Sequence, residues 1–216
     1  MNFDQRHYDA QPSSKGEKAF LIIGALIFLG MMFMEILSDY EPRKLGAVLI
    51  LLFWIPLLFL HEFGHAVMAK ILGWRVRKTV IGVGQVLIRT TLFNAPMEIR
   101  MLPLEGFVQI APVNLHYPRL KNALIYFAGP GIELLLFFII MGILGTGQMF
   151  VANDDYFTIT LQSLAYAALV GAVINLIPVG ILTNDGRTPN DGLGIILCLF
   201  QPEENYQRWI KEAEDK

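Results

Sequence analysis

The sequence predicts an α-helical membrane protein with about four transmembrane helices and a small β-hairpin or sheet inserted between the second and third. Three observations lead to this fold class. Of the 216 residues, 54% are apolar and only 17% are charged, whereas soluble domains carry about a quarter charged residues. Several long stretches contain almost no formal charge. The segment between the second and third of these stretches alternates in a β-prone pattern instead.

The composition also excludes several classes of protein. Seventeen basic residues against 19 acidic ones leave no basic excess, so we expect no nucleic-acid partner. The single cysteine, Cys198, excludes a disulfide framework and a cysteine-ligated metal site.

The predicted spans follow the charge-free stretches. A helix needs ~20 residues to cross ~30 Å of hydrocarbon. The third and fourth stretches reach this length easily, and the first two reach it by including their polar shoulders. The expected spans are residues 19–38, 45–71, 122–147 and 157–182.

These spans divide the chain into a polar N-terminal tail (1–18), one intramembrane domain (19–200) and a charged C-terminal tail (201–216), which we expect to form a short helix. The β-rich insertion covers residues 74–110, with β-prone runs at 85–92, 97–101 and 107–110 and a turn at 94–96.

Basic residues predict the orientation in the bilayer. They precede the first span, follow the last and number eight between Lys70 and Lys121, whereas the connection 145–156 has none. The positive-inside bias therefore predicts an integral, multi-pass protein with both termini and the middle segment in the cytoplasm.

The sharpest motif is His61-Glu62-Phe63-Gly64-His65, at the end of the second predicted span. On a helix, residues i and i+4 share a face, so both imidazoles can reach one zinc ion. Glu62 can then accept a proton from a water that the ion acidifies. Polar residues at membrane depth are expensive and indicate a functional site.

Zinc in a hydrolase takes a third protein ligand and leaves one position open. The best candidates follow the fourth span, where either Asp185 or Asp191 could return to the ion. Asn175 and Pro178 close that span. The Asn175 amide could stabilise a substrate carbonyl oxygen, or it could cap loose carbonyls of its own helix.

Four passages, in order, resemble the site-2 protease family of intramembrane zinc metalloproteases. The first is the His-Glu-x-x-His motif. The second is the glycine-rich loop Ile81 to Gly84, with the strand opening Pro103 to Val108. The third is the small-residue helix start Ala128 to Pro130, and the fourth is Asn175 to Pro178, an Asn-x-x-Pro that is followed by Asp-Gly. Glu105 stands where the family usually has glycine and Glu133 where it often has asparagine.

The resemblance implies a zinc endopeptidase in which His61, His65 and Asp191 bind the metal. It favours Asp191 over the alternative Asp185, because Asp191-Gly192 opens an apolar run as the family's Asp-Gly opens a helix. Sheet edges in the insertion would hold an unwound substrate by strand addition. Glu133 could pair with Arg119 or Lys121, or line the approach to the zinc.

The expected function is therefore cleavage of membrane-protein substrates in or next to a transmembrane segment, in the lipid bilayer, as in regulated intramembrane proteolysis. The resemblance also implies control by separate membrane proteins or by earlier shortening of the substrate. The alternative is a catalytically silent membrane scaffold or binding protein of the same fold, against which the intact His-Glu-x-x-His argues.

Overall fold

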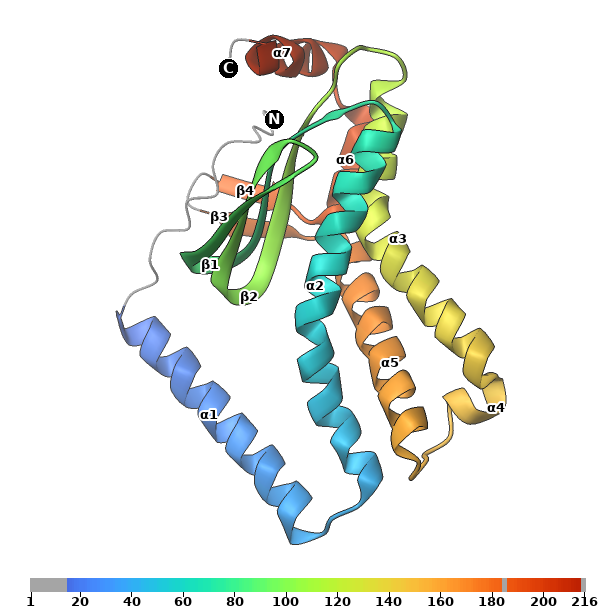
Figure 1. Cartoon of the computed structure of the whole chain (residues 1–216). Coiled ribbons are helices and arrows are strands. Elements are labelled where there is room, and N and C mark those ends of the chain that lie inside the picture. The colour runs from blue at the N-terminus through green and yellow to red at the C-terminus, as the bar shows by residue number, and fades with distance from the viewer. Residues whose placement is uncertain (1–14, 184–185, 215–216) are drawn as a thin grey trace.

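The computed structural model describes residues 15–183 and 186–214, and Figure 1 shows their arrangement. Three long helices pack side by side, a bent β-sheet and two C-terminal helices gather around one end of them, and α1 diverges from the rest. The helices are α1 (Lys15–Ser38), a 3-10 turn η1 (Pro42–Lys44), α2 (Leu45–Ile71), α3 (Pro118–Leu144), α4 (Thr146–Met149), α5 (Tyr156–Leu176), α6 (Asp191–Phe200) and α7 (Glu203–Glu214). The strands are β1 (Arg75–Leu92), β2 (Ala95–Ala111), β3 (Gly180–Thr183) and β4 (Gly186–Pro189).

Three stretches are long and apolar enough to cross a membrane, by length and composition: Pro42–Ile71, Pro118–Leu144 and Tyr156–Leu176. In α1, the apolar stretch found among the described residues is the shorter Leu26–Ser38. Most of the large apolar side chains of that stretch are exposed, as suits a helix that faces lipid rather than protein.

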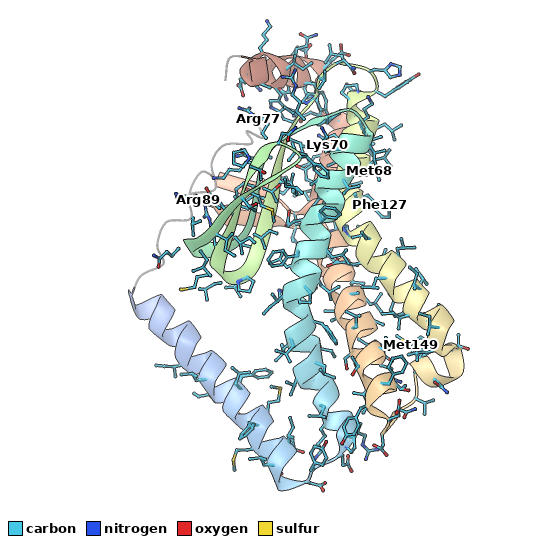
Figure 2. All side chains as sticks on the ribbon, viewed as in Figure 1. Met68, Lys70, Arg77, Arg89, Phe127 and Met149 are labelled. Carbon is cyan, nitrogen blue, oxygen red and sulfur yellow. The ribbon has the colours of Figure 1, made fainter. Side chains whose placement is uncertain are left out.

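Small residues let the three long helices approach closely. A side chain on Gly64 of α2 would come within 2.7 Å of the carbonyl oxygen of Ala128 in α3. Ala167 and Ala168 of α5 pack on Leu57 of α2. Membrane helices associate through such small-residue contacts because lipid supplies no hydrophobic drive between them. At the far end of the bundle, Met149 of α4 is fully buried (Figure 2).

Two span boundaries differ from the prediction. The third predicted span covers residues 122–147, whereas α3 runs from Pro118 to Leu144 and ends at Gly145, whose φ is +73°. The fourth is predicted to reach residue 182, whereas α5 ends at Leu176. Pro178 explains the earlier end, because proline has no N–H to continue the ladder and restricts the residue before it.

The insertion is a sheet in which each long strand folds back on itself. Thr79, Val80 and Ile81 each pair with two partners, one within residues 97–99 and one within 106–108. Segment 75–83 therefore lies between segments 95–101 and 106–111. The chain bends at Gly82 and Gly84, whose φ values are +89° and +85°.

A tight turn joins β1 to β2, and a group of charged side chains links segments of the sheet. The tight turn falls at Phe93 and Asn94, both with positive φ, one residue earlier than the predicted 94–96. Glu98 forms ion pairs with Lys78 at 2.9 Å and Arg100 at 2.8 Å. Hydrogen bonds from Arg100 and Lys78 hold the pKa of Glu98 below its usual range. The charges thus fasten the two central segments together.

The charged tail forms helix α7, as the sequence predicts. Tyr206 of this helix is fully buried and lies edge-to-face with Trp74, which follows α2. Arg119 Nε at the start of α3 donates to the carbonyl oxygen of Gln201, 2.9 Å away. These contacts fix α6 and α7 against the end of α2 that carries the histidines.

Candidate metal centre

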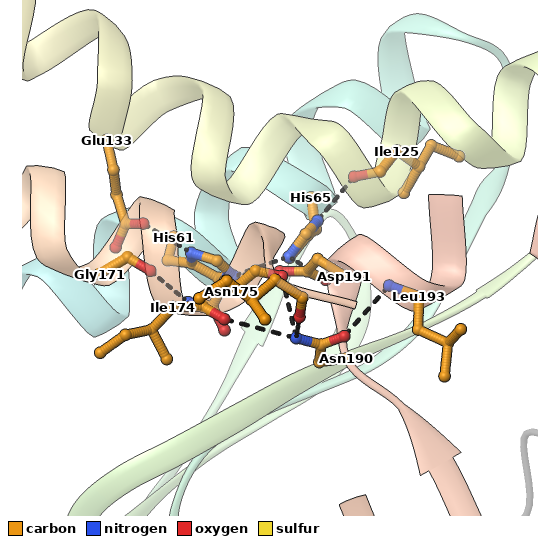
Figure 3. A network of polar contacts seen from close by, with 11 residues as sticks. His61, His65, Ile125, Glu133, Gly171, Ile174, Asn175, Asn190, Asp191 and Leu193 are labelled. Carbon is orange, nitrogen blue, oxygen red and sulfur yellow. Dashed lines mark hydrogen bonds and ion pairs between the residues drawn. The ribbon is translucent and has the colours of Figure 1, made fainter. Parts of the chain in front are cut away.

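His61 and His65 lie on one face of α2 and point at the same place. Their side chains are buried, with only 5% and 8% of each residue exposed. The two Nε2 atoms are 3.0 Å apart, as the i, i+4 spacing on a helix requires for a shared ligand. Figure 3 shows both rings turned toward the start of α6.

Asp191, the first residue of α6, approaches the same point from 130 positions further along the chain. Its Oδ2 is 2.9 Å from His61 Nε2, and its Oδ1 is 3.4 Å from His65 Nε2. His61, His65 and Asp191 each offer one ligand atom, and these atoms all lie within 4.8 Å of one another. Asp185, the alternative ligand, lies outside the described residues.

Asn190 connects the broken end of α5 to the start of α6. Its Oδ1 accepts from the backbone N–H of Leu193, as an N-cap does, and from that of Val179, both at 3.1 Å. Its Nδ2 donates to the carbonyl oxygens of Ile177 at 2.6 Å and Asn175 at 3.1 Å. The residue before Asp191 is therefore fixed on both sides (Figure 3). This role of Asn190 is not among the sequence predictions, although an asparagine before an apolar run is an N-cap signal.

Helix α3 supplies acceptors to the outer nitrogens of both rings. His65 Nδ1 is 2.6 Å from the carbonyl oxygen of Ile125. His61 Nδ1 is 3.2 Å from Glu133 Oε2, within ion-pair distance but without the alignment of a hydrogen bond. Among the described residues, Glu133 therefore pairs with His61 and not with the predicted Arg119 or Lys121.

Gly129 of α3 faces the two Nε2 atoms directly. A Cβ on this residue would collide with Nε2 of both His65 and His61. From the sequence, this glycine is expected to allow close approach between helices rather than to take part in chemistry. In the structure, its missing side chain keeps open the space between the imidazoles and α3.

The donor set and its spacing fit a zinc ion. Two imidazole nitrogens and one carboxylate oxygen are ligands that zinc prefers, with a fourth position open in catalytic sites. Ligand atoms about 2.1 Å from a tetrahedral ion lie roughly 3.4 Å from one another. The observed separations of 3.0, 2.9 and 3.4 Å are close to this value, and Gly129 leaves the place unfilled.

Glu62 lies beside this cluster, between α2 and the sheet. It is 4% exposed, and its Oε2 has no hydrogen-bond partner among the described residues. Gly106 of β2 packs on it so closely that a Cβ there would lie 2.7 Å from Glu62 Cγ and Oε1. The predicted strand opening, Pro103 to Val108, thus contacts the glutamate of the His-Glu-x-x-His motif.

Asn175 is engaged within its own helix. Its Nδ2 donates to the carbonyl oxygen of Gly171 at 3.1 Å, and its backbone carbonyl oxygen accepts from Asn190. An amide carries two donor hydrogens, so this contact leaves one available. Asn175 also lines the cavity described next.

A cavity of about 490 Å³ adjoins the cluster. Its lining combines the polar residues of the cluster with apolar residues of α2 and β2, among them His61, Glu62, Leu57, Phe107, Val108 and Asn175. Glu105 and Glu133, the two departures from the family pattern, also line it. A peptide segment in this cavity would contact both the sheet and the candidate metal ligands.

The sequence places the chain in a known family. Residues 47–159, more than half of the chain, match the sequence model of Peptidase family M50, the site-2 protease family. The chain belongs to peptidase family M50. Zinc is the cofactor that goes with this metallopeptidase family, and the cluster of His61, His65 and Asp191 could hold it. With its apolar helices, the M50 protein is an integral membrane protein.

Curated relatives carry names that agree with family M50. A protein of Campylobacter jejuni named "Putative zinc metalloprotease Cj1068" is 30% identical over an alignment of 149 residues that covers 61% of this chain and 38% of that protein. Two Helicobacter pylori proteins, each named "Putative zinc metalloprotease", are 39% identical over 64 residues, 30% of this chain and 17% and 18% of their own lengths. The chain thus spans well under two thirds of the relatives that it matches.

Proposed function

We propose that this M50 protein is an intramembrane zinc endopeptidase that cleaves peptide bonds in or next to a transmembrane segment of membrane-protein substrates. The observation that carries the proposal is that His61 and His65, on a helix apolar enough to span a membrane, meet Asp191 of α6 in a buried cluster. Beside this cluster lies Glu62, whose Oε2 has no hydrogen-bond partner among the described residues. A buried carboxylate next to such a cluster has no evident structural use.

In the proposed mechanism, His61, His65 and Asp191 hold the zinc ion. When bound, zinc polarises the substrate carbonyl and makes a water molecule acidic enough to be deprotonated near neutral pH. Glu62 accepts the proton of the attacking water through its carboxylate and then delivers it to the leaving amine. Asn175 donates its second amide hydrogen to the substrate carbonyl oxygen, where charge develops.

The sheet has a proposed role in opening the substrate. A transmembrane helix satisfies its own backbone hydrogen bonds, so it must be unwound before a hydrolase can reach its carbonyls. Residues Gly106 to Ile110 of β2 line the cavity beside Glu62. An unwound substrate segment lying extended in this cavity, beside the sheet, would pass the proposed general base.

The proposed membrane arrangement has four spans, with α1 as the first, and both termini in the cytoplasm. Basic side chains such as Lys70, Arg77 and Arg89 lie at the sheet-bearing end of the molecule (Figure 2), which the positive-inside rule assigns to the cytoplasm. We further propose that the proteolysis is regulated, by separate membrane proteins or by earlier shortening of the substrate.

The test uses the full chain purified in detergent, with zinc content and cleavage of synthetic transmembrane peptides measured on the same samples. Glu62→Gln should keep stoichiometric zinc and lose cleavage, because the amide cannot accept the proton. His65→Ala should lose both zinc and cleavage. Cleavage retained by Glu62→Gln would contradict the mechanism, and wild-type protein without zinc would favour a silent scaffold.

A further inference from the structure

Glu133 is a carboxylate buried inside the bundle. It lies in the middle of α3 with 3% of its surface exposed, and its Oε2 has no hydrogen-bond partner among the described residues. In the part of the chain that the structure describes, its ion pair is with His61. A buried charge with so little compensation destabilises a fold, so packing alone does not account for this residue.

The surroundings make room for the carboxylate. Gly171 of α5 faces it, and a Cβ on that glycine would lie 3.0 Å from Glu133 Oε1 and 3.3 Å from its Cδ. The side chain therefore occupies a gap in α5 and reaches across to α2, where its Oε2 is 3.2 Å from His61 Nδ1. Three helices meet at this carboxylate.

The two histidines have parallel surroundings. Each Nε2 faces the other ring and Asp191, and each Nδ1 faces an oxygen atom from α3. For His65 that atom is the backbone carbonyl oxygen of Ile125, and for His61 it is a carboxylate oxygen of Glu133. An acceptor at Nδ1 keeps the proton there and leaves the Nε2 lone pair for a metal.

We propose that Glu133 is a positioning residue for the metal site: its carboxylate holds the His61 ring and its tautomer so that Nε2 is presented to zinc. This inference rests on the proposed zinc site. Glu133 does not touch the metal or the substrate. It does for His61 what the Ile125 carbonyl does for His65, but through a side chain that mutation can remove.

The test is Glu133→Leu in the full chain, with two measurements that separate positioning from structure. Zinc affinity, measured by competition with a chelating dye, should fall by about 10- to 100-fold, the usual effect of losing such a partner. The melting temperature of the metal-free protein is measured on the same variant, because removing one partner of a buried pair can by itself destabilise the fold. A residue needed only for folding would lower that melting temperature and leave zinc affinity unchanged.

Glu35→Leu is the matched control. Glu35 is also a carboxylate in an apolar helix and pairs with Lys44, but it is 70% exposed, so zinc affinity should not change. Glu133→Gln, which keeps an oxygen acceptor of the same reach, should restore most of the affinity lost in Glu133→Leu.

The outcomes distinguish this inference from the proposed function. Wild-type protein that binds no zinc overturns both. Wild-type and Glu133→Leu proteins that bind zinc within about threefold of each other overturn the positioning role alone, since its loss is expected to exceed this margin. Should the leucine variant not fold, Glu133→Asp carries the test. It keeps the charge but withdraws it from His61, so undiminished zinc affinity would overturn the inference.

Discussion

At the scale of single residues, the candidate site depends on side chains that are absent as much as on those present. Gly129 lies against both imidazoles, Gly106 against Glu62 and Gly171 against Glu133. Each comes from a different element, and each leaves room for one polar group of the site. The polar groups themselves project from elements whose other residues are mostly apolar.

Gly129→Ala should abolish zinc binding. Its Cβ would occupy the space beside Nε2 of His61 and His65, and the backbone of α3 cannot withdraw without breaking its packing on α2. Metal content and chelator-competed affinity measure the loss. Gly142→Ala is the control, because it lies in the same helix and its Cβ would meet nothing within 4 Å. Full zinc content in the Gly129 variant would refute the proposed position of the ion.

Gly106→Ala should separate catalysis from metal binding. Its Cβ would fall 2.7 Å from Glu62 Cγ and Oε1 and displace that carboxylate, while the histidines remain in place. We expect zinc to be kept and peptide cleavage to fall by about 10²- to 10⁴-fold, the contribution of a positioned general base. Adding Gly106→Ala to Glu62→Gln should cause little further loss, since both remove the same group. A further large drop would show that Gly106 acts elsewhere.

The sequence predicted the histidines and Glu62 because helical spacing alone brings them together. The preference for Asp191 over Asp185 came from the resemblance and from the apolar run after Asp191-Gly192. What the sequence could not predict is which face of α3 meets the imidazoles. The closeness of Gly129, Ile125 and Glu133 to the rings follows from the packing of two helices, which no local pattern encodes.

At the scale of elements, the break between α5 and α6 positions the third candidate ligand. Proline at 178 ends α5 early, and a short hairpin, β3 and β4, returns the chain to the start of α6. Asn190 then joins the two helix ends. The sequence predicted a span to residue 182 because hydropathy continues past the point where the backbone ladder stops.

Variants of Asn190 should divide its two functions. Asn190→Ser keeps an oxygen that can cap α6 but loses the amide that donates to α5, whereas Asn190→Ala loses both. We expect zinc affinity to fall in both variants, because the start of α6, which carries Asp191, loses the hydrogen bonds of Asn190 to the end of α5. The alanine variant should also be less stable than the serine variant by about 1 kcal/mol, the usual value of an N-cap. Thermal unfolding of the metal-free proteins measures that difference, and equal stability would argue against the cap.

The sheet shows a different limit of prediction. Alternation predicted strands at 85–92, 97–101 and 107–110, and all three lie in β1 or β2. It did not predict that segment 75–83 pairs on both sides, at the centre of the sheet. Strand order depends on long-range pairing and on the bends at Gly82 and Gly84, whereas alternation reports only local burial.

At the scale of the whole molecule, composition alone predicted the class of protein, because a chain with so few charges and such long apolar stretches cannot bury them in a soluble fold. Three of the four predicted spans match stretches long enough to cross a membrane. The remaining predicted span is the first one, and its helix, α1, diverges from the bundle in Figure 1. A measurement of membrane topology is therefore needed to decide whether α1 spans the bilayer.

Single-cysteine labelling should establish this topology. Cys198 is buried and the only cysteine, so Cys198→Ala provides a background for Asp39→Cys, Asp154→Cys and Gln207→Cys. Asp39 and Asp154 lie in the two connections at the end of the bundle opposite α7, which carries Gln207 (Figure 1). A membrane-impermeant maleimide applied to intact cells should label the first two positions and not the third, and inverted vesicles should reverse the pattern.

A fourth labelling position, Ser13→Cys, decides the number of spans. If α1 crosses the bilayer with the N-terminus in the cytoplasm, this position should be protected in intact cells together with Gln207→Cys. Labelling of Ser13→Cys from the same side as Asp39→Cys would leave three spans and place the N-terminus outside. That result would leave the site on α2, α3 and α6 intact, because none of its described contacts involves α1. The proposal that α1 spans the bilayer and the proposal of a zinc site at His61 can therefore be contradicted independently.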